Sequence, residues 1–156
     1  MGWESMIDGL AKHYPGQFHV PFTTFRDIFR KIEEKFIVKE WSQYMYTNWL
    51  GSLKKETKIK AILLPELDNE IATLDSINNY WVVVVFGQDQ RARQYVYDCH
   101  VDSMKYLISY FIRNTSGDFF IVDKKYNWIT YFKVDYNNKE VSLFKSGDTQ
   151  TPFEKR

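Results

Sequence analysis

Three adjacent residues, Asp98, Cys99 and His100, carry the side chains that nucleophilic catalysis uses. A cysteine thiolate attacks the substrate, a histidine takes up the proton, and a third group orients the histidine. Neighbours at the start of a helix do not point at one another, so adjacency alone does not favour catalysis. The alternative is a helix cap at Asp98 or Cys99, a small buried thiol and a surface histidine. A thiol at a helix N-terminus can have a lowered pKa, so the reactivity of Cys99 stays open.

The three histidines also raise the question of a metal centre. His13 and His19 flank a Pro15-Gly16 turn, and a pair this close in sequence can contribute to a metal site. No acidic ligands accompany the pair, which favours an incidental arrangement. The chain also lacks the glycine-rich phosphate-binding motifs, the nucleophile elbow and the His-Glu-x-x-His motif. We therefore expect no catalytic residue, no cofactor and no metal.

Two basic doublets, Lys124-Lys125 and Arg91-x-Arg93, fall in polar turns. If both turns lie at one end of a sheet, they form a small positive patch beside Tyr126, which suits RNA or an acidic partner. The alternative is two solvated turns. The formal net charge of only +1 disfavours a general nucleic-acid binder, so we do not expect nucleic acid as the partner.

The sharpest charge asymmetry lies between residues 54 and 76. Its first part has lysines at positions 54, 55, 58 and 60, whereas Glu66 to Ser76 contains four acids and no Lys or Arg. This segment is either a solvated loop or an acidic patch that docks on a basic surface of another protein. Tyr and Trp are typical anchors of such interfaces. The candidate partner-binding residues are therefore Glu66, Asp68, Glu70 and Asp75, with Tyr44, Tyr46 and Trp49 as possible aromatic anchors.

Composition and length limit the number of domains, the disulfides and the membrane segments that the chain can have. A chain of 156 residues favours a single domain, which we place at residues 1–145, followed by a frayed polar tail at 146–156. One cysteine excludes an internal disulfide. The longest apolar run, Trp81–Phe86, is far too short to span a membrane, and the N-terminus lacks an apolar signal core. We expect a cytoplasmic protein without membrane contact; its oligomeric state is not indicated.

Hydrophobic spacing predicts the elements that position these residues. Apolar residues at helical spacing indicate helices at residues 3–12, 24–38 and about 99–113. Apolar and aromatic runs indicate strands at residues 58–64, 80–86, 94–97, 119–122, 126–134 and 140–144. This order predicts an α+β fold with a mostly antiparallel sheet of about five to six strands. The N-terminal helices and the inserted helix should pack on one face of it.

A resemblance covers about a third of the chain, residues 80–132. The segment Trp81-Val-Val-Val-Val-Phe86, then Tyr95-Val-Tyr97, a helix, and Asp118-Phe-Phe-Ile-Val-Asp-Lys-Lys-Tyr-Asn-Trp128 resembles a pattern in small uncharacterised bacterial proteins. Those proteins are similar in turn to the SUKH superfamily, which has an α+β fold and many members that are immunity proteins against toxins. After Trp128 the chain departs from that pattern: it has no histidine in residues 129–135, where the similar proteins have an Asn-His-His-Asp stretch. The resemblance implies no catalytic residue.

Three functional hypotheses follow. The first is a non-enzymatic protein-binding inhibitor, an immunity-type protein that blocks a cognate toxin domain. The second is a small enzyme or nucleic-acid-associated factor with a site near Asp98–His100 and the Lys124-Lys125 turn. The third is a phage-encoded inhibitor of a host defence protein, which would use the same binding features as the first.

Overall fold

The computed structural model describes residues 2–21, 23–38, 49, 52–86 and 96–154. Seven strands form one sheet in which every neighbouring pair is antiparallel, in the order β1-β4-β3-β5-β6-β7-β2. The strands are β1 (Phe18–His19), β2 (Thr57–Leu63), β3 (Asn79–Val85), β4 (Val96–His100), β5 (Asp118–Asp123), β6 (Trp128–Asp135) and β7 (Glu140–Gly147). The predicted α+β class is confirmed, with slightly more strands than expected.

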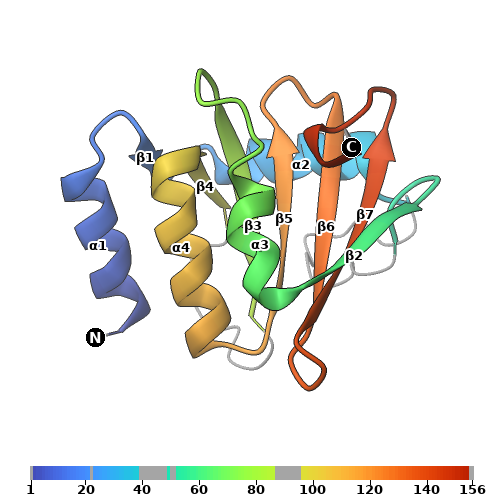
Figure 1. Ribbon diagram of the computed structural model, residues 1–156. Coiled ribbons are helices and arrows are strands. Elements are labelled where there is room, and N and C mark those ends of the chain that lie inside the picture. The colour runs from blue at the N-terminus through green and yellow to red at the C-terminus, as the bar shows by residue number, and fades with distance from the viewer. Residues whose placement is uncertain (1, 22, 39–48, 50–51, 87–95, 155–156) are drawn as a thin grey trace.

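Helices cover both faces of this sheet (Figure 1). On one face lie α1 (Trp3–His13), the short α3 (Leu67–Ile71) and α4 (Val101–Asn114); on the other lies α2 (Phe25–Phe36). The expectation that all the helices share one face is therefore wrong. The cause lies in the central strands, because β3 is apolar at every position from Tyr80 to Val85 and both of its faces need cover.

Each of the two cores contains a stacked aromatic pair from β5 and β6. Phe119 of β5 stacks on Phe132 of β6 with ring centroids 4.6 Å apart, toward α4. Phe120 stacks on Tyr131 at 4.9 Å, toward α2. Successive residues of a strand point to opposite faces, so one register serves both cores.

Two predicted boundaries are corrected at the ends of strands. Tyr126 lies in the β5–β6 turn with φ of +57°, and β6 begins at Trp128. Asp98 and Cys99 do not cap α4, because both belong to β4 and pair with β3. The cap is His100, whose Nδ1 accepts a hydrogen bond from the Asp102 N–H at 3.1 Å.

We expected a frayed tail at residues 146–156, but the described part of this segment packs on the sheet. Strand β7 continues to Gly147, and residues Pro152–Glu154 form the short 3-10 helix η4. Its Phe153 is 1% exposed and contacts the rings of Trp128 and Phe132 edge-on. The segment is otherwise polar, so its composition did not predict that Phe153 would be buried.

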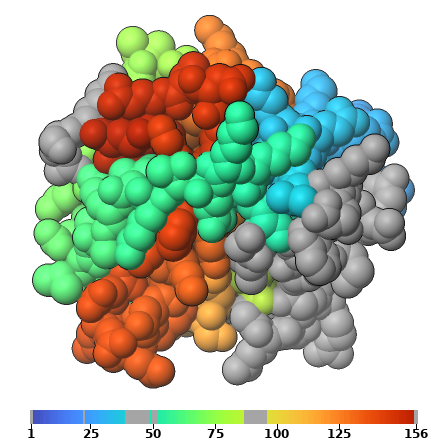
Figure 2. Space-filling model, turned by 90° about the vertical axis from the view of Figure 1, so that its right-hand side faces the viewer, coloured from blue at the N-terminus to red at the C-terminus, as the bar shows by residue number. Residues whose placement is uncertain are grey.

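Strand β2 forms one edge of the sheet and lies at the surface on the side shown in Figure 2, where it leads into η3 (Leu64–Glu66) and α3. Its register with β7 is interrupted between Lys58 and Lys60, an irregularity that together with lysine side chains protects an edge from pairing with other chains. Among the described residues, no helix combines the length and the apolar character that crossing a membrane requires.

Candidate functional site

The residues of the Asp98-Cys99-His100 candidate have separate structural roles. Cys99 of β4 is fully buried in the core that also contains residues of α1 and α4, and burial raises the pKa of its thiol well above the usual value. Asp98 lies 2.6 Å from the Lys124 ammonium and accepts a hydrogen bond from the Asn79 amide. His100 caps α4. The thiol is therefore protonated and shielded from substrate, which is the opposite of what a nucleophile needs.

The histidine pair stays at the surface. His13 is the last residue of α1 and His19 lies in β1, and both side chains are exposed. In the part of the chain that the structure describes, no three His, Cys, Asp or Glu side chains come together as a metal site would require.

The acidic segment divides into one buried acid and three exposed ones. Glu70 is 4% exposed, and both of its carboxylate oxygens lie 2.8 Å from the ammonium of Lys60 on β2. It therefore joins α3 to the edge strand and does not present a free charge, so its assignment to a docking surface is corrected. Glu66, Asp68 and Asp75 are exposed.

Two exposed apolar side chains flank the exposed acids. Leu63, at the end of β2, is 57% exposed, and Ile77, between α3 and β3, is 86% exposed. We call the exposed side chains of this continuous segment, Leu63, Glu66, Asp68, Asp75 and Ile77, the acidic face. Large apolar side chains at this exposure are scarce in the described residues, where Tyr106 is the third.

The loop that carries Ile77 is braced from three directions. The carboxylate of Asp75 accepts a hydrogen bond from the Ile77 N–H at 2.8 Å, and the Tyr80 hydroxyl accepts one from the Asp75 N–H at 3.2 Å. The ring nitrogen Nε2 of His100 lies 2.6 Å from the carbonyl oxygen of Ser76. Because Nδ1 of the same ring accepts from Asp102, Nε2 carries the proton and donates. The loop therefore holds Ile77 outward in a fixed backbone.

The aromatic anchors differ from those proposed from the sequence. Trp49 is fully buried and donates its indole N–H to Glu33 Oε2 at 3.0 Å, so it cannot contact a partner in this structure. Tyr44 and Tyr46 lie outside the described residues. Tyr106 of α4 is 56% exposed, and its ring lies 5.8 Å from that of Tyr14 at the end of α1.

Sequence reasoning missed both Ile77 and Tyr106, although each left a signal. Tyr106 falls outside the apolar stripe of its helix, which consists of Val101, Met104, Leu107, Ile108 and Phe111. A large aromatic residue off the buried stripe of a helix is expected at the surface. Ile77 is the one apolar residue in the polar run Asp75–Asn79, where no strand or helix pattern accounts for it.

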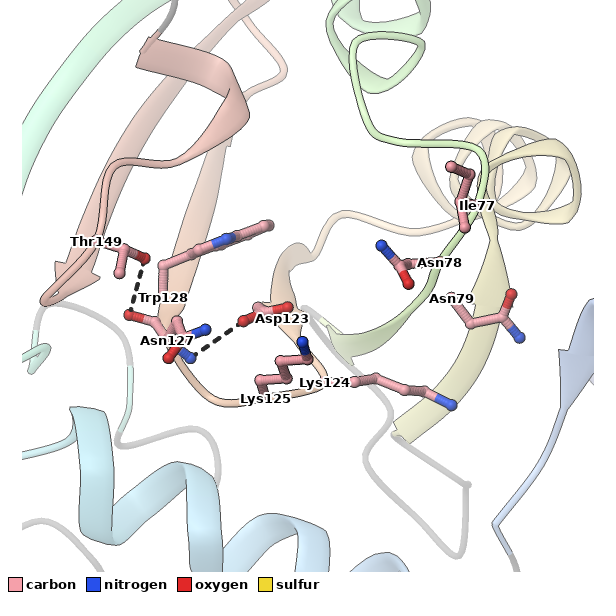
Figure 3. A pocket seen from close by; sticks show the side chains of 9 residues that line it. All are labelled: Ile77, Asn78, Asn79, Asp123, Lys124, Lys125, Asn127, Trp128 and Thr149. Atoms are coloured by element: carbon pink, nitrogen blue, oxygen red, sulfur yellow. Dashed lines mark hydrogen bonds between the residues drawn. The ribbon is translucent and has the colours of Figure 1, made fainter.

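The β5–β6 turn lines a groove of about 560 Å³, whose other wall is the loop from Ile77 to Asn79 (Figure 3). Lys124 and Lys125 both line it, but the ammonium of Lys124 is paired with Asp98 and also lies 4.4 Å from the centroid of the Trp81 ring. Arg91 and Arg93 lie outside the described residues. The expected positive patch is therefore reduced to Lys125 in the part of the chain that the structure describes.

Comparison of the chain with protein-family models, with curated proteins and with solved structures gives no match.

Proposed function

We propose that this protein binds another protein through its acidic face and acts as a non-enzymatic inhibitor. The observation that carries the proposal is Ile77, an isoleucine 86% exposed on a braced loop beside exposed carboxylates. Leaving such a side chain in water forgoes about 1.5–3 kcal/mol of burial. An isolated exposed apolar residue needs no explanation, but one held outward by a braced loop next to the Asp75 carboxylate favours an interface anchor.

The charge of the acidic face indicates the chemistry of the partner. The exposed Asp102 at the start of α4 adds a carboxylate near the Asp75 end of this face, because it lies 3.6 Å from Nδ1 of His100, the ring that contacts Ser76. The segment from Ala61 to Phe86 contains no Lys or Arg, and Lys125 lines the groove on the other side of Ile77. Long-range attraction of this kind accelerates the encounter with a basic surface and disfavours an acidic one.

A nuclease-like toxin domain with a basic substrate groove is the class of partner that fits this face. Covering the groove with carboxylates blocks it without any chemistry by the inhibitor, which is how an immunity-type protein acts. The resemblance of residues 80–132 to proteins similar to the SUKH superfamily supports this choice. A phage-encoded inhibitor of a host defence protein would use the same face, whereas nothing observed at Asp98–His100 favours an enzyme.

The experiment compares charge reversal on the two sides of the molecule. The variant E66K/D68K/D75K reverses the charge of the acidic face, and E34K/D27K makes a smaller reversal at exposed positions of α2 on the opposite layer. We expect the first variant to associate with the partner at least about tenfold more slowly at low salt, with the difference shrinking as salt is added. Equal association rates and equal salt dependence for wild type and the triple variant would contradict the proposal.

A further inference from the structure

The groove beside Ile77 has a chemistry different from that of the acidic face. It lies between the loop Ile77–Asn79 and the β5–β6 turn, with Thr149 at its far side. Its volume of about 560 Å³ is within the range of sites that hold ligands. Ile77 belongs to both features, so a partner that packs on Ile77 meets this groove at its margin.

The charges that line the groove balance. In Figure 3 the side chain of Lys125 points into the groove, whereas that of Lys124 extends away from it toward β4. Lys125 has no carboxylate within ion-pair distance among the described residues. Asp123 contributes the opposite charge: its Oδ2 accepts a hydrogen bond from the Asn127 N–H at 3.2 Å, and no described residue bonds to Oδ1. A singly charged ligand would bind weakly in this groove, because one of the two lining charges attracts it and the other repels it.

Two side-chain amides on opposite walls remain available to a ligand. Asn78 makes only a long contact of 3.4 Å to Asp75 Oδ2, and the side-chain amide of Asn127 has no partner in the described structure. Each amide offers a donor and an acceptor side by side, the same pair that a peptide group presents. Two groups of this kind match the main chain of an extended polypeptide, whose N–H and C=O groups alternate along its length.

We propose that this groove binds an extended polypeptide segment through its main chain, with the amides of Asn78 and Asn127 as its hydrogen-bonding groups. Lys125 and Asp123 then select oppositely charged side chains of the same segment, and Ile77 packs against an apolar one. The inference rests on the proposed function only for the source of the segment, which is the protein seated on the adjoining acidic face.

The test uses a peptide probe that needs no partner. N-acetyl-glycyl-glycine amide, which consists of main chain alone, is titrated into the ¹⁵N-labelled protein. The side-chain amide signals of Asn78 and Asn127 and the indole N–H signal of Trp128, which lines the groove, are followed by NMR. We expect these signals to shift along saturating curves, and the variants N78A and N127A to weaken binding about fivefold each. The matched control N69A removes an exposed amide from α3 and should leave the affinity unchanged.

Three outcomes would overturn the proposal: shifts that do not saturate, shifts that are as large at Asn69 as in the groove, or a stronger saturating response to sodium acetate or methylammonium chloride than to the peptide. The last would make the groove an ion site. The peptide titration does not use the partner protein, so its outcome is independent of the charge-reversal experiment. Either experiment can fail while the other succeeds.

Discussion

His100 joins the start of α4 to the loop that presents Ile77, with its Nε2 only 2.6 Å from the carbonyl oxygen of Ser76. The same ring caps the helix through Nδ1, so one side chain holds both the helix end and the loop. Both bonds require the neutral ring with its proton on Nε2. The shape of the acidic face near Ile77 therefore depends on a residue that the sequence presents as a candidate catalytic base.

Replacing His100 with alanine should lower the free energy of unfolding by about 1–2 kcal/mol, because one helix cap and one hydrogen bond are lost. It should also weaken partner binding, since the loop no longer holds Ile77 in place. Urea unfolding and titration with the partner measure the two effects. The control H13A removes an exposed histidine at the end of α1 and should change neither. A fully stable H100A protein with unchanged affinity would show that the brace is dispensable.

Glu70 should contribute to stability and not to binding. Glu70 is 4% exposed, and its carboxylate lies 2.8 Å from the Lys60 ammonium. Replacing Glu70 with alanine leaves that ammonium without its partner. We expect the free energy of unfolding to fall by about 2 kcal/mol, below the range for fully buried pairs because Lys60 is partly exposed. The neighbouring D68A should cost less than about 0.5 kcal/mol. Equal unfolding midpoints for E70A and D68A would contradict this assignment.

Cys99 should resist thiol reagents as long as the protein is folded. The side chain is buried and its pKa is raised, so both access and thiolate are lacking. Labelling with a chromogenic disulfide reagent should give no signal in native buffer and one thiol per chain in denaturant. Rapid stoichiometric labelling of the native protein would revive the enzyme hypothesis at Asp98–His100.

Asp118 gives the protein a pH dependence of defined sign. Burial raises the pKa of its carboxyl, although the Tyr131 hydroxyl and the Val134 N–H donate hydrogen bonds to it. A raised pKa in the folded state means that the charged form is disfavoured there. The stabilising contribution is therefore fully present below the ordinary Asp pKa and is lost as the pH rises through the folded value.

Chemical denaturation across this pH range should show that D118N removes part of the decline. The variant D135N provides a comparison of opposite sign, because hydrogen bonds from Asn138 lower the pKa of Asp135, so that its contribution is lost as the pH falls. Parallel pH profiles of the free energy of unfolding for wild type and D118N would contradict a raised pKa of Asp118.

Local pattern was enough for most elements of the fold, because long apolar or aromatic runs such as Tyr80–Phe86 admit few alternatives. Local pattern failed to predict features that depend on contacts between residues far apart in the sequence. Phe153 becomes part of the core only because Trp128 and Phe132 lie opposite it, and α2 takes the far face only because β3 needs cover there.

The candidate site was predicted in part for the same reason. Runs of charge show in the sequence, so the acidic segment was visible. Whether a given acid is free depends on residues far along the chain, as Lys60 shows for Glu70, and whether an aromatic residue is free depends on burial, as for Trp49. The braced loop is created by pairing β3 with β4, which brings His100 to Ser76.

The most direct test of the account is the affinity of the variant I77D for the partner. Wild type, I77D and the opposite-face control E34K are immobilised, the partner is captured from the native host and identified, and each variant is then titrated with the purified partner. All three proteins should melt alike, because both substituted side chains are exposed. We predict that I77D weakens binding at least about thirtyfold, as for an interface hot spot, while E34K does not. An unchanged dissociation constant for I77D would contradict the claim that the acidic face is where this protein binds.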